Sequence, residues 1–140
     1  MRCFKLCLMG VVLLFFGVTS TFALAANTDP LFINLTSSNS HRATMAIGFG
    51  LSQQERGHAV TIFLNDTSVQ LASKKNALNY KKQQKLLHEI VAHKGKVIVC
   101  PTCMKYYGVS EKDLIKGLKK GNPDMTGAQL FKDHTRTMAW

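Results

Sequence analysis

Three short apolar segments constrain the fold of this chain more than any other feature. They span residues 31–36, 60–64 and 96–100, and each has the length and the apolar or β-branched content of a buried strand. The stretches between them, residues 40–56 and 82–93, carry apolar side chains at helical spacing. Strands that alternate with helices form a parallel sheet with helices on its faces. The sequence therefore predicts an α/β domain with a parallel sheet covered on both faces.

The rest of the chain carries shorter patterns that extend this prediction. Residues 69–73 are compatible with a short helix, and residues 110–117 with a helix whose first residue can cap it. A short fourth strand is expected near Leu118. Residues 126–133 predict a last helix, and residues 135–140 a last strand.

The N-terminal segment has the three regions of a secretory signal peptide. Arg2 and Lys5 give it a positive start, residues 6–18 are almost wholly apolar, and residues 23–25 form an A-x-A pattern for a signal peptidase. The apolar run is shorter than the roughly 20 residues that span a bilayer as a helix. We therefore expect cleavage rather than a stable membrane anchor.

Cleavage after Ala25 would divide the chain into a signal peptide, residues 1–25, and one domain, residues 26–140. An exported domain meets an oxidising compartment, where a close cysteine pair can form a disulfide. We expect a periplasmic or secreted protein.

The chain is basic, with 18 lysine and arginine residues against 8 aspartate and glutamate residues and a formal net charge of +10 at pH 7. Its lysines gather within residues 74–85 and 112–120. We interpret both groups as solvated helix faces. Export argues against nucleic acid as a partner, so none is expected.

The cysteines are the residues most suggestive of chemistry. Cys3 and Cys7 lie in the predicted signal peptide, so the domain keeps Cys100 and Cys103 in a Cys-Pro-Thr-Cys sequence. Cys100 closes the third predicted strand, and Pro101 prevents simple continuation of the ladder. In open parallel sheets the functional crevice lies beyond the carboxyl ends of the strands. The pair therefore lies where such folds place chemistry.

Three loops are expected at that edge of the sheet, at residues 36–41, 65–67 and 100–107. The two-residue spacing of the cysteines lets their sulfurs reach one another. A thiol near a helix N-terminus is also expected to have a lowered pKa, because the thiolate gains from backbone N–H groups. We therefore favour a redox or sulfur-handling role with both cysteines as its site.

Other roles for the pair remain open. A static disulfide would close a loop too short to constrain the unfolded chain much. The thiolates could bind Cu(I) alone, or another metal together with His41, His88, His93 or His134, and a small ligand could fill the crevice. A thioredoxin-like site fits poorly, because the pair follows two β–α units and Pro123 is the one later proline. The last alternative is an interaction module with incidental cysteines, and the residues do not decide whether the protein is an enzyme.

Several segments resemble one known family. They are the first strand with its polar loop, the Gly57-His58 turn before the second strand, the run VIVCPTCMKYYGV at residues 97–109, and EKDLIKG at residues 111–117. Together they are similar to the DsrE/DsrF-like family, which includes TusD-type sulfur-relay subunits and YchN-like proteins. The resemblance covers nearly the whole predicted domain.

The resemblance implies a three-layer α/β/α sandwich with a five-stranded parallel sheet, assembled as a trimer or hexamer. It matches Cys100 to the cysteine that accepts sulfur as a persulfide in relay members and passes it to a partner protein. Cys103 has no counterpart in single-cysteine relay subunits, so it is expected to act as a resolving thiol. No cofactor is implied.

Overall fold

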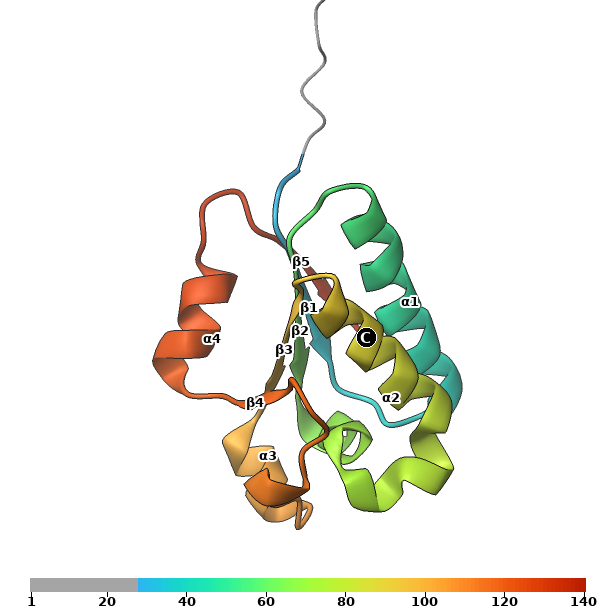
Figure 1. Ribbon diagram of the computed structural model, residues 1–140. Helices are drawn as coiled ribbons and strands as arrows, with labels where there is room; N and C mark the ends of the chain where they lie inside the picture. The colour runs from blue at the N-terminus through green and yellow to red at the C-terminus, as the bar shows by residue number, and fades with distance from the viewer. Residues whose placement is uncertain (1–27) are drawn as a thin grey trace, which may run out of the picture.

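The computed structural model describes residues 28–140, so the predicted signal peptide lies outside the described residues. One sheet of five parallel strands, in the order β4-β3-β2-β1-β5, forms the centre of the domain (Figure 1). The predicted α/β fold with a five-stranded parallel sheet is confirmed. The strands are β1 (Leu31–Leu35), β2 (Val60–Leu64), β3 (Lys96–Val99), β4 (Lys119–Lys120) and β5 (Arg136–Ala139).

Two long helices cover one face of the sheet. α1 (Ser40–Glu55) and α2 (Ala77–Ala92) pack against each other and against β1, β2 and β3 (Figure 1). Alternate residues of the three central strands form the core with them, and burial of their apolar side chains is the main source of stability. These strand residues are Ile33, Leu35, Val60, Ile62, Leu64, Val97 and Val99.

The opposite face is covered more thinly. α4 (Pro123–Leu130) lies over it, and α3 (Pro101–Tyr106) continues from β3 at the carboxyl edge (Figure 1). The sheet thus lies between two helical layers, but α4 contains no buried residue, whereas Phe32 and Ile98 are buried beneath this layer. Within residues 28–140, none of the helices has the length and apolar character to cross a membrane.

Short polar side chains and glycine set the ends of α1. Asn39 caps the helix, because its Oδ1 accepts the N–H groups of His41 and Arg42 at 3.1 Å each. Beyond the other end, Gly57 has a φ of +91°, a left-handed conformation that glycine adopts without strain. The chain can then turn directly into β2.

The second half of the chain departs from the expected boundaries. α2 begins at Ala77 rather than at residue 82, and a 3₁₀ helix, η1 (Asp66–Ala72), replaces the short helix expected over residues 69–73. α4 starts at Pro123, because the side chain of Asn122 caps it by accepting the Met125 N–H at 2.7 Å.

The predicted helix over residues 110–117 is wrong. This segment forms one 3₁₀ turn, η3 (Glu111–Asp113), and then runs along the end of η1. The Ile115 N–H donates to the Ala72 carbonyl at 2.9 Å, and Ser73 and Leu114 form an isolated bridge. Tertiary pairing with η1 has replaced the bonds that a helix would make. Leu118 is buried just before β4 rather than within it.

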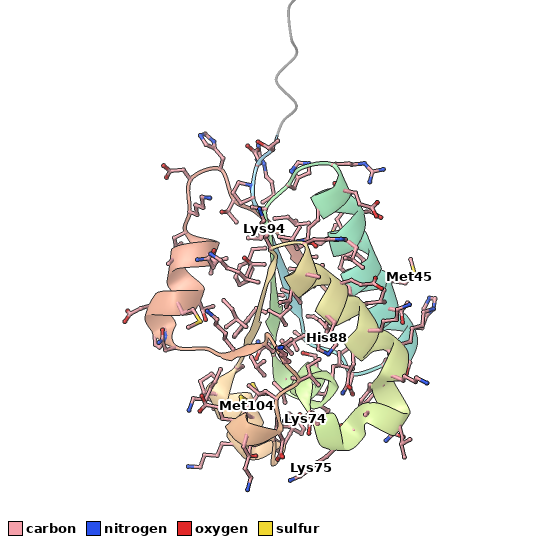
Figure 2. All side chains as sticks on the ribbon, viewed as in Figure 1. Met45, Lys74, Lys75, His88, Lys94 and Met104 are labelled. Carbon is pink, nitrogen blue, oxygen red and sulfur yellow. The ribbon has the colours of Figure 1, made fainter. Side chains whose placement is uncertain are left out.

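The lysines of both groups are exposed, as expected, but those of residues 112–120 lie on η3, the following turn and β4 rather than on the expected helix face. Lys74 and Lys75 project from the short 3₁₀ helix η2 (Lys74–Asn76), near the end of the molecule that holds α3 (Figure 2). Some of these lysines form surface ion pairs, which contribute little to stability individually. The pairs are Lys75–Asp113 at 2.8 Å, Lys85–Glu89 at 3.8 Å and Lys120–Glu111 at 2.6 Å.

Candidate functional site

Cys100 marks the point where β3 ends and α3 begins. Its N–H completes the sheet ladder by donating to the Leu64 carbonyl at 2.9 Å, and its φ and ψ remain extended. Pro101 then starts the helix, at a position where the missing N–H costs nothing. The Cys100 side chain caps the helix, because its Sγ accepts the Cys103 N–H at 3.4 Å.

Cys103 lies on the first turn of α3 and is held by the loop that follows β2. Its Sγ–H donates to Asn65 Oδ1 at 3.0 Å, and its Sγ accepts the Asp66 N–H at 3.2 Å. Both cysteines are half-buried free thiols. The structure therefore brings the two predicted site residues together and ties one of them to a second loop.

The loop after β2 is shaped to hold this thiol. Asp66 has a φ of +48°, in the left-handed region, and its N–H also contacts the Asn65 side-chain oxygen at 2.9 Å. On the far side, the Asp66 carboxylate accepts the Tyr107 hydroxyl at 2.6 Å. The loop is thus bound to both ends of α3.

The first loop joins the same arrangement through Thr67. The Thr67 hydroxyl donates to the Thr36 carbonyl at 3.0 Å and accepts the Ser38 N–H at 3.0 Å. Ser68 adds a hydrogen bond from its hydroxyl to the Leu35 carbonyl at 2.6 Å. The three loops do meet at the carboxyl edge of the sheet, and the loop after β2 links the other two.

The pKa of the Cys103 thiol is raised above its ordinary value, contrary to the expectation of a lowered pKa at the helix N-terminus. Burial is the main cause, followed by the hydrogen bond to the Cys100 side chain. The Asp66 N–H favours the thiolate but is outweighed. Cys103 therefore holds its proton in this arrangement.

Tyr107 is the other perturbed acid at this edge. The hydrogen bond that its hydroxyl donates to Asp66 raises the pKa of Tyr107 to about 12. Ionising the phenol would break this bond and place two negative charges side by side. The Tyr106 ring packs edge-on against Tyr107, with 4.8 Å between the ring centroids, and Tyr106 is largely exposed.

The candidate metal ligands do not gather around the cysteines. Within residues 28–140, no group of three or more histidine, cysteine, aspartate or glutamate side chains is arranged to hold a metal ion. The site with two thiolates and a histidine that the sequence left open is therefore not formed here. The histidines considered for it, His41, His88, His93 and His134, are all exposed.

The sequence of residues 30–134 matches the model of the DsrE/DsrF-like family. The chain belongs to this family. The matched region includes both cysteines, the loop after β2 and every strand except β5. No curated protein matches the chain.

Solved structures share this DsrE/DsrF-like fold at low sequence identity. The YchN protein of E. coli is 19% identical with a TM-score of 0.64, and the alignment covers 79% of this chain and 99% of that one. MTH1491 from Methanobacterium thermoautotrophicum is 8% identical with a TM-score of 0.66, covering 80% and 99%. BT1422 from Bacteroides thetaiotaomicron is 20% identical with a TM-score of 0.63, covering 83% and 98%. Both of the latter are described as proteins of unknown function.

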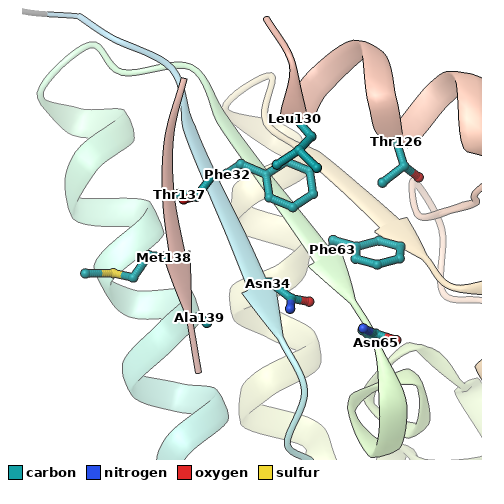
Figure 3. Close-up of a pocket in the computed structure, with 9 residues that line it drawn as sticks. All are labelled: Phe32, Asn34, Phe63, Asn65, Thr126, Leu130, Thr137, Met138 and Ala139. Atoms are coloured by element: carbon teal, nitrogen blue, oxygen red, sulfur yellow. The ribbon is translucent and has the colours of Figure 1, made fainter. Parts of the chain in front are cut away.

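A pocket of about 520 Å³ adjoins the cysteine site of this family member on the thinly covered face of the sheet (Figure 3). It is lined by residues of β1, β2, β5 and α4, and Asn65, which holds Cys103, is part of its wall. The loop at residues 65–67 was expected at this edge of the sheet, but the sequence indicated neither the pocket nor a role for Asn65. The signal that could have singled out Asn65 is its position as the first polar residue after a buried strand.

Proposed function

We propose that this DsrE/DsrF-like protein handles sulfur or redox equivalents through Cys100 and Cys103, with Cys100 as the acceptor and Cys103 as the resolving thiol. Membership of the family suggests a sulfur-relay or redox-related role. The observation that carries the finer assignment is the unequal environment of the two sulfurs. Each Sγ accepts a backbone N–H, but the Cys103 thiol also donates its proton to Asn65 and has a raised pKa.

The first step is transfer of one sulfur atom. The Cys100 thiolate attacks the outer sulfur of a persulfide donor, R–S–SH; a Cys100–S–SH bond forms, the donor S–S bond breaks, and the donor leaves as R–S⁻. A thiolate is the attacking species in such exchanges, so the thiol that stays protonated is the weaker nucleophile.

The second step gives Cys103 its role. After Cys103 loses its proton, its thiolate attacks the inner sulfur of the Cys100 persulfide; the Cys100–Cys103 disulfide forms and hydrosulfide leaves. A partner protein with a dithiol then reduces the disulfide. Alternatively, an acceptor thiolate takes the outer sulfur before Cys103 reacts, and Cys100 leaves as a thiolate.

Mass spectrometry of the intact protein tests this assignment. The reduced protein is incubated with a persulfide donor, alongside Cys100→Ser, Cys103→Ser and the double variant. Cys103→Ser should accumulate one added sulfur atom on Cys100, and the native protein should release sulfide and lose two hydrogens. If the native protein and Cys103→Ser both remain at the mass of the reduced chain, the proposal fails.

We also propose that the protein is exported and that the signal peptide is removed after Ala25. The charged start, apolar run and A-x-A pattern of residues 1–25 support this proposal. Terminal sequencing of the protein isolated from its native cells should find Ala26 as the first residue, in the periplasmic or secreted fraction. A chain that retains residues 1–25 would contradict it.

A further inference from the structure

The pocket under α4 contains a buried hydrogen-bond acceptor that has no partner. Asn34 lies near the end of β1 and its side chain lines the pocket (Figure 3). Its Oδ1 is fully buried and accepts no hydrogen bond from residues 28–140. A buried polar group without a partner is costly and uncommon, so it calls for an explanation.

The neighbouring asparagine is different. Asn65 also lines the pocket, but its Oδ1 already accepts hydrogen bonds from the Cys103 thiol and the Asp66 N–H. The two asparagines thus divide the roles: Asn65 belongs to the cysteine site, and Asn34 offers a free acceptor to whatever fills the pocket.

The walls restrict what the occupant can be. Phe32 and Phe63 form an apolar floor with ring centroids 6.2 Å apart, and Leu130 of α4 faces them across the pocket (Figure 3). None of the nine lining residues carries a charge. An ionised ligand would lose its hydration here without gaining a counter-charge, so the walls favour an uncharged one. The lining residues are Phe32, Asn34, Phe63, Asn65, Thr126, Leu130, Thr137, Met138 and Ala139.

We propose that this pocket binds a small, uncharged, planar amide or lactam, whose N–H donates to Asn34 Oδ1 while its ring packs on Phe32 and Phe63. An amide presents a donor beside an acceptor, which complements the oxygen and NH₂ group of the Asn34 side chain. A volume of about 520 Å³ lies within the usual range for small-molecule pockets. The proposal is independent of the thiol chemistry at Cys100 and Cys103.

Benzamide and two close analogues test the proposal on the isotope-labelled native protein. N,N-dimethylbenzamide keeps the ring and carbonyl but has no N–H, and benzoate has a negative charge. In NMR titrations, benzamide should shift the Asn34 side-chain amide and the backbone amides of Phe63 and Leu130 saturably. Both analogues should bind about tenfold more weakly, as expected for one lost hydrogen bond or one buried charge.

Variants test whether the Asn34 amide is what benzamide binds. Asn34→Leu keeps the size of the side chain but removes its amide, and should weaken benzamide binding about tenfold. Asn79→Leu, on an exposed position of α2, should bind as the native protein does. If Asn34→Leu does not fold, the three compounds on the native protein still decide the outcome.

Two results would overturn the proposal. One is that benzamide produces no saturable shifts around the pocket. The other is equal binding of benzamide and N,N-dimethylbenzamide, because the Asn34 oxygen would then not be what the ligand recognises. Loss of persulfide transfer with intact benzamide binding would refute only the proposed thiol function.

Discussion

At the scale of single residues, the hydrogen bond between Tyr107 and Asp66 is open to direct measurement. Asp66→Asn removes the negative charge that holds the phenol proton, so the pKa of Tyr107 should fall from about 12 toward the ordinary value near 10. A spectrophotometric titration of phenolate absorbance follows the change. Tyr107→Phe, compared with the native protein, identifies which titration belongs to this residue.

The hydrogen bond between Tyr107 and Asp66 stabilises the folded protein only within a certain pH range. The folded-state pKa of Tyr107 lies above the unfolded value, so the contribution to stability is complete below about pH 10 and disappears as the pH rises toward 12. Asp66→Asn should therefore lose less stability than the native protein across this window. An unchanged Tyr107 titration in Asp66→Asn would show that the carboxylate does not hold the proton.

The cysteine residues show what a sequence pattern can and cannot locate. The position of Cys100 was predictable, because a β-branched run ends there and proline follows. The loops at residues 65–67 and 100–107 were expected at one edge of the sheet, but the contacts of Cys103 with Asn65 and Asp66 were not, because they depend on how β2 pairs with β3. The raised pKa of Cys103 was missed for the same reason, since burial by these neighbours is its main cause.

At the scale of elements, two glycines respond oppositely to an added methyl group. A Cβ at Gly95, between α2 and β3, would lie 2.8 Å from the Ile90 carbonyl oxygen and 2.7 Å from Ile90 Cγ2. A Cβ at Gly48, within α1, would meet nothing within 4 Å. Gly95→Ala should destabilise the protein by about 1–3 kcal/mol through overpacking. Gly48→Ala should stabilise it by about 0.5–1 kcal/mol through helix propensity.

Urea unfolding of the two variants and the native protein measures this difference. Gly48→Ala serves as the matched control, because it makes the same chemical change in open space. Equal urea midpoints for the two variants would contradict this prediction, because the turn before β3 would then have moved to accommodate the added methyl group at Gly95.

Elements were predictable where the apolar period alone determines them. β1, β2, β3 and α1 follow from such patterns and lie close to their predicted bounds. The structure of the segment after α3 was not predictable. Ser110 and Asp113 have the spacing of a helix start, but the Ser110 hydroxyl donates instead to the Asp113 carboxylate at 2.5 Å. The Asp113 carboxylate is also paired with Lys75, which lowers the pKa of Asp113 and fixes the turn beside η1 and η2. Such a tertiary contact leaves no periodic trace.

At the scale of the whole molecule, the two faces of the sheet differ more than the sequence suggests. Phe32 and Phe63 belong to strands that are apolar except for Asn34 and Thr61, and these two polar residues do not show which face of the sheet is thinly covered. The arrangement of helices decides this: α1 and α2 both cover one face, and α4 covers the other without burying any of its own residues. A parallel sheet with both faces covered was predictable, but unequal cover was not.

We propose that the domain assembles with copies of itself through α1 and β5. β5 is an edge strand, and edges of this kind readily pair or become covered. Three exposed apolar side chains lie on these two elements. Met45 and Phe49 belong to α1, and Met138 of β5 points toward α1 (Figures 2 and 3). The Phe49 ring packs at a tilt of 43° against the half-buried ring of Trp140, with 5.9 Å between the ring centroids, which extends this surface. We call the patch formed by Met45, Phe49, Met138 and Trp140 the α1–β5 patch.

Light scattering after size-exclusion chromatography tests this assembly. The native protein should elute as a trimer or hexamer, and Met45→Asp combined with Met138→Asp should shift it to monomer, because each introduces a negative charge that would be desolvated at the interface. Leu78→Asp is the matched control: Leu78 is 98% exposed at the start of α2 and lies outside the α1–β5 patch. A monomeric native protein contradicts the proposal. If Leu78→Asp is monomeric while the double variant still assembles, the interface lies outside the α1–β5 patch. If the double variant is monomeric yet still takes up sulfur on Cys100, each subunit contains a complete thiol site.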